Sequence, residues 1–237
     1  MASVYLQSVY ILHSRPFQDS SLLVDVLSED HGRLTVVAKG ARSARGRHRF
    51  PVYPFTKLVA SWQGKSDLKT LTELEQQGQL RQLMGRRMFC GLYVNELVIR
   101  LLPSHDDCSE VFRRYDQVMT SLETLEGDSN DYLEPLLRAF EFELLELMGY
   151  GLTFSDISTG DVLEPDSQYR IAEMMGFVKI DGNVEKRQGS YLGSELLAVI
   201  NNDFSDVSVR RAAKRLVREL LAPHIGNKPL KSRELFR

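Results

Sequence analysis

Residues 21–39 read Ser21-Leu-Leu-Val-Asp-Val-Leu27, then Ser-Glu-Asp-His-Gly-Arg33, then Leu34-Thr-Val-Val-Ala-Lys39. The two outer parts are short runs rich in Val and Leu, which is the composition of β-strands. Between them, Asp30-His31-Gly32 has the residue types of a tight turn. The stretch therefore predicts two strands joined by a turn.

Similar segments lie on both sides of this pair. They are rich in Val, Leu, Tyr, Phe and Thr and are separated by Gly, Pro, Asp and Ser: Val4–His13, Pro54–Trp62 and Leu68–Leu74. A second turn is expected at Gly64–Asp67, between the last two strands. Five short strands within residues 1–78 predict a small barrel of the OB type, whose strand faces and loops bind oligonucleotides in known examples.

Beyond residue 79 the apolar residues recur at helical spacing. This spacing predicts helices over Leu80–Ile99, Val111–Leu122, Asp131–Met148, Ser194–Asn201 and Val207–Leu221. Asp131 and Glu134 have the spacing of a capping box at the start of the third helix. An irregular insertion at about residues 150–190 contains one short strand, Gly176–Ile180. The predicted fold class is α+β, with a mainly helical domain over residues 79–237.

The formal net charge of −2 conceals an uneven distribution of charge. Residues 1–69 carry 10 Lys and Arg against 5 Asp and Glu, and residues 207–237 carry 9 against 2, whereas residues 70–206 carry 11 against 25. A single charge run is usually a solvated face. Two separate basic clusters with so few acids favour a polyanionic ligand, because phosphate binding relies on Lys and Arg.

The amino-terminal cluster supplies the first candidate DNA contacts: Arg33, Lys39, Arg42, Arg45, Arg47, Arg49, Lys57, Lys65 and Lys69. Four of these, Arg42, Arg45, Arg47 and Arg49, lie in the loop Gly40–Pro51, which contains no acid and is expected to be a mobile basic arm. The aromatic residues Tyr53, Phe55 and Trp62 are available for stacking on bases, but packing in the core is the expected role of each.

The last predicted helix supplies the second group of candidates. Its cations fall on one face, opposite an apolar face: Arg210, Arg211, Lys214, Arg215 and Arg218. Apart from Glu219, that helix lacks the acidic partners four residues away that a merely solvated basic face normally has. The apolar face is expected to pack and the basic face to be free to meet phosphates.

Motifs for catalysis or metal binding are absent from the sequence, so no catalytic residue, metal or cofactor is expected. Gly64-Lys65-Ser66 resembles the end of a P-loop, but Val59 stands where that motif requires glycine. The five histidines are dispersed, and the two cysteines, Cys90 and Cys108, suit structural thiols in a reducing compartment. The lack of a signal peptide and of a long apolar run predicts an intracellular location.

A series of strings, in this order, strongly resembles the RecO family of bacterial recombination and repair proteins: His13–Phe17, Ser21–Asp25, Asp30–Arg33, Ala38–Arg42, Pro54–Thr56, Leu68–Thr70, Tyr93–Leu97, Leu147–Gly151 and Lys228–Phe236. The resemblance implies an OB domain, binding of single- and double-stranded DNA, annealing of strands, and a non-catalytic mediator role in the cytoplasm at the nucleoid. The implied partners are RecR, RecF and single-strand-binding protein, and the mediator helps RecA to load. Many relatives carry a four-cysteine zinc module after the Gly-Tyr pair, but Gly151–Ile180 contains no Cys, so zinc is not expected.

The resemblance also ranks the candidate residues. Lys39, Arg42, Lys65 and Lys69 lie in matching strings, as do Lys228, Lys231 and Arg233 of the carboxy-terminal segment. Candidate contacts to the acidic tail of single-strand-binding protein are Arg138, Arg210, Arg211 and Arg215. Two other functions stay open: an adaptor that binds only acidic protein tails, and a magnesium-dependent nucleic-acid enzyme that uses carboxylates of the acidic middle.

Overall fold

A computed structural model describes residues 3–43, 52–104, 108–152, 154–156, 159–172, 176–180, 189–226 and 228–236. The chain forms two compact units: Met1–Glu126 together with Leu230–Arg237, and Gly127–Pro229. The first unit groups the barrel with two helices and the carboxy-terminal segment. The boundary predicted at residues 78/79 instead separates the strands from all the helices.

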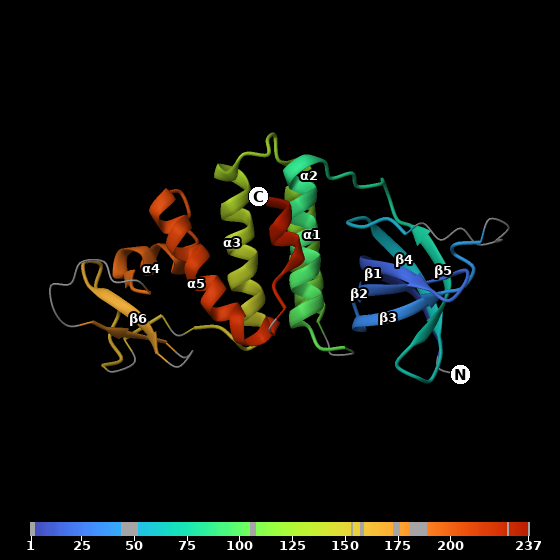
Figure 1. The fold of residues 1–237 in the computed structure, drawn as a ribbon, viewed down its shortest axis with the longest axis horizontal. Helices are drawn as coiled ribbons and strands as arrows, with labels where there is room; N and C mark the ends of the chain where they lie inside the picture. The colour runs from blue at the N-terminus through green and yellow to red at the C-terminus, as the bar shows by residue number, and fades with distance from the viewer. Residues whose placement is uncertain are drawn as a thin grey trace. The chain divides into compact units, whose positions relative to one another are not determined.

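The first unit contains the predicted barrel (Figure 1). Its strands are β1 (Ser3–Phe17), β2 (Ser21–Ser28), β3 (Gly32–Ala38), β4 (Lys57–Gln63) and β5 (Lys69–Gln76), closed in the order β1-β2-β3-β5-β4. Neighbouring strands are antiparallel except β3 and β5, which are parallel. This is the five-stranded OB-type barrel that the sequence predicts.

The barrel is filled by apolar side chains that alternate along its strands, among them Val9, Ile11, Val24, Val26, Leu34, Val36, Leu58, Ala60, Trp62 and Leu71. Of the three aromatic residues weighed for stacking, Trp62 and Phe55 are buried, as expected. Tyr53 is exposed, contrary to expectation. A Cβ atom on Gly91 would lie 2.7 Å from the Phe55 ring, so this glycine lets Phe55 pack closely on a helix.

The remainder of the first unit consists of α1 (Gly85–Leu101), α2 (Ser109–Thr124) and the 3-10 helix η1 (Lys231–Phe236). Glu96 of α1 holds the start of η1: one carboxylate oxygen accepts the Lys231 amide at 3.0 Å, and the other accepts the Ser232 amide at 2.8 Å and hydroxyl at 2.6 Å. Leu230 and Ser232 are buried there. The carboxy-terminal segment is therefore an integral part of the unit that contains the amino-terminal barrel.

The second unit contains α3 (Asn130–Leu147), α4 (Gly193–Ile200) and α5 (Val207–Ile225) with a small sheet, β7-β6-β8. The sheet comprises β6 (Gln168–Ala172), β7 (Gly176–Lys179) and β8 (Tyr191–Leu192), of which the sequence predicts only β7. The turn into α4 requires glycine, because a Cβ atom on Gly193 would lie 1.9 Å from the carbonyl oxygen of Glu164. The predicted insertion is thus partly ordered as a sheet.

Candidate nucleic-acid interface

The barrel cations fall into two groups with different surroundings. One row of pairs crosses four strands of the barrel: Lys57 of β4 pairs with Tyr10 of β1, Tyr10 with Leu27 of β2, and Leu27 with Arg33 of β3. Lys57 and Arg33 therefore lie on one wall of the barrel. The Arg33 guanidinium donates to the Leu102 carbonyl and the Ser104 hydroxyl, both at 2.9 Å. These bonds join β3 to the end of α1, so Arg33 has a structural role, and its contact with DNA stays a prediction.

Lys57, on the same wall, also faces the helices. Its ammonium lies 3.9 Å from the Asp116 carboxylate and 5.3 Å from the centre of the Phe112 ring. The hydroxyl of Tyr10 donates to Asp116 as well. Burial, followed by the neighbouring Asp116 carboxylate, raises the pKa of Tyr10, so the phenol stays a neutral donor. Lys57 is therefore used within the first unit and is not counted among the free cations.

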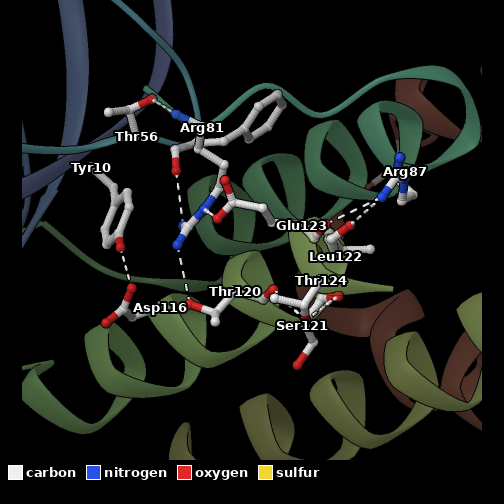
Figure 2. A network of polar contacts seen from close by, with 11 residues as sticks. Tyr10, Thr56, Arg81, Arg87, Asp116, Thr120, Ser121, Leu122, Glu123 and Thr124 are labelled. Atoms are coloured by element: carbon white, nitrogen blue, oxygen red, sulfur yellow. Dashed lines mark hydrogen bonds and ion pairs between the residues drawn. The ribbon is translucent and has the colours of Figure 1, made fainter. Parts of the chain in front are cut away.

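A polar network continues along this wall into the segment that leaves the barrel (Figure 2). Arg81 donates to Glu123 at 2.9 Å, to the Phe55 carbonyl at 3.0 Å and to the Thr120 hydroxyl at 3.1 Å. Its own amide donates to the Thr56 hydroxyl at 3.1 Å. Sequence reasoning missed Arg81, because its partners are distant in the chain. The network fixes the barrel on α2.

The other group consists of Lys39, Arg42, Lys65 and Lys69, which we name the β3–β5 cation cluster. The parallel pair Val36↔Lys69 places Lys69 beside Val36 of β3. Lys39 comes three residues after Val36 in the sequence. At the usual rise per residue, this offset corresponds to about 10 Å along the strands. Lys65 lies in the turn between β4 and β5. Of the four cations that the family resemblance ranked first, Lys39, Lys65 and Lys69 thus lie next to the ends of β3 and β5. The contacts of Arg42 place it beside the turn between β1 and β2.

The cluster is available to a ligand. Lys39, Arg42 and Lys65 are exposed and Lys69 is half-buried. The Arg42 amide donates to the Ser20 carbonyl at 2.9 Å, while its guanidinium makes only a long contact, 3.5 Å, to the Gln18 carbonyl. Among the residues that the structure describes, no acid forms an ion pair with these four side chains. Unneutralised cations of this kind are what phosphate binding uses.

Arg45, Arg47 and Arg49 lie outside the described residues. Their assignment as DNA contacts stays a prediction that rests on charge alone.

Arg210 corrects the prediction of a free basic face on α5. Its side chain is only 8% exposed and donates to Asp131 of α3 at 2.7 Å and to the carbonyls of Phe204 and Ser205 at 3.0 and 2.8 Å. Lys214 pairs with Glu134 at 3.1 Å. The expected capping box at Asp131 and Glu134 is also wrong. The N-cap position is Ser129, and no side chain forms a capping hydrogen bond there. The acids missing from α5 are supplied by α3.

Arg215 is exposed but engaged. Its guanidinium lies 5.2 Å from the centre of the Tyr191 ring and donates to the Ser190 carbonyl at 3.3 Å. Arg211 and Arg218 are exposed, and no ion pair to another described residue is found for either. The face predicted to be uniformly basic therefore offers two free guanidinium groups.

Arg138 was expected to meet a partner protein, but its side chain is buried and donates to the buried carboxylate of Glu141 at 2.7 Å. Separating this buried ion pair would leave an uncompensated buried charge, so Arg138 is not available to an acidic tail.

In the carboxy-terminal segment Lys228 and Lys231 are exposed and Arg233 is half-buried. These three stay candidates.

Sequence reasoning also missed Arg15, although it lies in one of the matching strings. Its guanidinium is half-exposed and lies 3.1 Å from the buried Asp25, which also accepts a hydrogen bond from the Thr35 hydroxyl at 2.6 Å.

Within the described ranges, no group of three or more His, Cys, Asp or Glu is arranged to hold a metal ion. Both cysteines are buried. No helix in the described part of the chain is long and apolar enough to cross a bilayer.

Comparison with known families gives matches over nearly the whole chain. The family model described as "Recombination protein O N terminal" matches residues 1–79, and "Recombination protein O C terminal" matches residues 83–234. The two models meet where the barrel passes into the helices.

Curated relatives named "DNA repair protein RecO" match at similar levels. The protein of Haemophilus influenzae strain Rd is 43% identical over 98% of this chain and 95% of its own length. The proteins of Actinobacillus pleuropneumoniae serotype 7 and Cellvibrio japonicus are each 42% identical, over 96% and 98% of this chain and 92% and 97% of their own lengths.

Proposed function

This chain belongs to the recombination protein O (RecO) family, and from that premise we propose that it is a non-catalytic mediator that binds DNA through its barrel. Membership places it among recombination and DNA repair proteins. In the proposed role it anneals complementary strands and helps to load RecA onto single-stranded DNA covered by single-strand-binding protein. It acts there with RecR and RecF, at the nucleoid.

The observation that supports DNA binding most directly is the β3–β5 cation cluster. An OB-type barrel binds a strand by tracking its backbone with Lys and Arg. Lys39, Arg42, Lys65 and Lys69 form no ion pair with another described residue, whereas Arg33 bonds the end of α1 and Lys57 contacts α2. The division leaves one part of the barrel surface for phosphates.

Annealing requires that the protein hold two strands. The barrel carries the β3–β5 cation cluster, and the second unit carries free guanidinium groups at Arg211 and Arg218. Because each unit has its own unpaired cations, a single chain has two surfaces on which phosphates release their counterions. This arrangement supports the annealing part of the proposal.

The test is fluorescence anisotropy of a labelled single-stranded oligonucleotide titrated with the purified chain over a series of salt concentrations. Single strands lose about 0.7 units of log K per log unit of salt for each phosphate contact, so four contacts predict a slope near −3. Annealing of complementary strands is followed in the same buffers. A flat salt dependence would contradict the proposal.

Two other outcomes would support the alternative functions. If the chain binds a peptide with the acidic tail of single-strand-binding protein but no naked DNA at low salt, the adaptor function replaces the mediator function. If magnesium causes turnover of the DNA strand, and chelation stops it, the protein is an enzyme. Each result contradicts the proposal in a different way.

A further inference from the structure

Strand β1 contains a bulge near its start. The pairs Ser3↔Gln63 and Val4↔Trp62 are followed by Gln7↔Ala60, so β1 advances three residues while β4 advances two. The extra residue turns two consecutive side chains to the outside, and Tyr5 and Leu6 are 69% and 68% exposed. In a regular strand, one of the two would point into the barrel.

The bulge is held in an unfavourable backbone conformation. Leu6 has a φ angle of +53°, in the left-handed region that residues other than Gly, Asn and Asp rarely adopt. Its amide donates to the Ser61 hydroxyl at 3.2 Å, and that hydroxyl, which is buried, donates to Glu73 at 3.2 Å. Strained residues and bulges that the surroundings enforce in this way are concentrated at binding sites.

The bulge lies beside one end of the β3–β5 cation cluster. Gln63 pairs with Ser3 on one side and with Thr70 on the other, so the start of β1 is two strands from the start of β5. At the usual strand spacing this separation is about 10 Å. The turn that joins β4 to β5 carries Lys65 and an exposed Leu68 and leads into Lys69. Exposed apolar side chains and two ammonium groups therefore share this part of the barrel.

A nucleotide of an unpaired strand has the same two components, an apolar base face and an anionic phosphate. Tyr5 offers an aromatic ring and Leu6 an apolar branch, while the neighbouring lysines carry no ion pair among the described residues. Both side chains are largely exposed to solvent. A protein partner anchors its side chains in pockets, whereas a base stacks on an exposed ring.

We propose that Tyr5 and Leu6 form a stacking platform for an unpaired nucleobase, with Lys65 and Lys69 binding the adjoining phosphates. The inference rests on the proposed function, which requires DNA binding but assigns no residue to the bases. It also names the preferred substrate. Base faces are accessible only in unpaired strands, so the bulge directs this part of the barrel to single-stranded DNA.

The experiment compares two ligands of equal length, an oligothymidylate of about 16 nucleotides and the same chain with abasic residues, in titrations of the full-length protein. Tyr5→Ala is expected to bind the oligothymidylate about tenfold more weakly and the abasic chain unchanged. Tyr5→Phe keeps the ring and should keep the affinity. Leu6→Asn, which suits the left-handed backbone, should weaken binding of the oligothymidylate severalfold.

The control is Tyr132→Ala, which removes another largely exposed tyrosine, on α3, and should leave both affinities unchanged. The salt slope of Tyr5→Ala should equal that of the wild type, because stacking releases no counterions. If the wild type binds DNA and Tyr5→Ala binds both ligands equally well, or loses affinity for both, the platform is refuted and the proposed function stands. If the wild type binds neither ligand, both the stacking platform and the proposed function are refuted.

Discussion

Arg33 and Arg42 are nine residues apart in the same basic run, yet their surroundings differ. Arg33 donates two bonds of 2.9 Å to the end of α1 and to the residues that follow it, whereas Arg42 is exposed and makes one long contact. A bonded guanidinium that is partly removed from water stabilises the fold, and its removal leaves the Leu102 carbonyl and the Ser104 hydroxyl without this donor. Residue type alone does not separate these two roles; the partner atoms do.

Glu96 is the residue on which docking of η1 depends. Burial alone would raise the pKa of Glu96, but the hydrogen bonds from Ser232 and Lys231, with Arg100 nearby, together hold that pKa below its ordinary value of 4.5. A carboxyl whose pKa is lowered by folding contributes its stability above the unfolded value, and the contribution is lost as pH falls through the folded value. Docking of η1 should therefore weaken only below about pH 4.5.

Glu96→Gln is expected to loosen η1. In the wild type the Lys231 amide and the Ser232 amide and hydroxyl share two carboxylate oxygens, whereas the neutral amide side chain has one acceptor oxygen. Bonds to a charged acceptor contribute roughly 1.5–3 kcal/mol each, so losing the charge should cost the local structure about 1–3 kcal/mol. Hydrogen exchange at the amides of Lys231 and Ser232 measures the effect. Unchanged protection of both amides would contradict this account of the segment, and Glu234→Gln, an exposed acid of η1 itself, is the control.

At the scale of elements, α5 shows what helical periodicity can and cannot predict. The apolar face with Ala213 and Leu216 is buried, as predicted. The opposite face is divided, because Asp131 and Glu134 of α3 reach Arg210 and Lys214. Periodicity reports which side of a helix packs, but it contains no information on which residues of another helix lie beside its edge.

Arg210→Ala is expected to destabilise the second unit by about 1–3 kcal/mol, through loss of the bonds to Phe204, Ser205 and Asp131. The cost stays below that of a fully buried pair, because the Asp131 carboxylate left behind is largely in water. Urea denaturation measures it. Arg211→Ala, one residue further, should leave stability unchanged and weaken DNA binding. Equal effects of the two variants on stability would show that the α3–α5 ion pairs contribute nothing.

The longer elements were predictable for physical reasons. The Val- and Leu-rich runs of β2 and β3 and the stripe of α3 have lengths at which periodicity is informative. Strands β6 and β8 were missed, since two to five residues carry too little pattern. The 3-10 helix η1 was missed because its start is fixed by Glu96, 135 residues away. For the site, the choice of Lys39, Arg42, Lys65 and Lys69 stays a prediction. The bonds of Arg33, Lys57 and Arg210 could not be foreseen, because their partners are distant in the sequence. The partner of Arg138 is Glu141, three residues on in the same helix, and sequence reasoning did not consider this pair.

At the scale of the whole molecule, the chain passes from the first unit through the second and returns to the first at Leu230. The carboxy-terminal segment thus contributes to the unit that contains the barrel, although it is last in the sequence. Acids outnumber cations between the two basic ends, and several of those acids neutralise cations inside each unit, as Asp116 and Asp131 do. Among the described residues of the barrel, Lys39, Arg42, Lys65 and Lys69 stay without such an acidic partner.

In the proposed function, DNA is bound at the β3–β5 cation cluster. The measurement that tests it most directly is the salt dependence of single-strand binding by Lys39→Glu/Arg42→Glu, with Arg113→Glu/Arg170→Glu, two exposed cations elsewhere, as a control with the same change in net charge. The Lys39→Glu/Arg42→Glu variant is expected to bind DNA about 1–3 kcal/mol more weakly, with a slope shallower by about 1.4, since two phosphate contacts are lost. The control should keep the wild-type slope. A slope that is unchanged in the first variant, or reduced equally in both, would contradict the account.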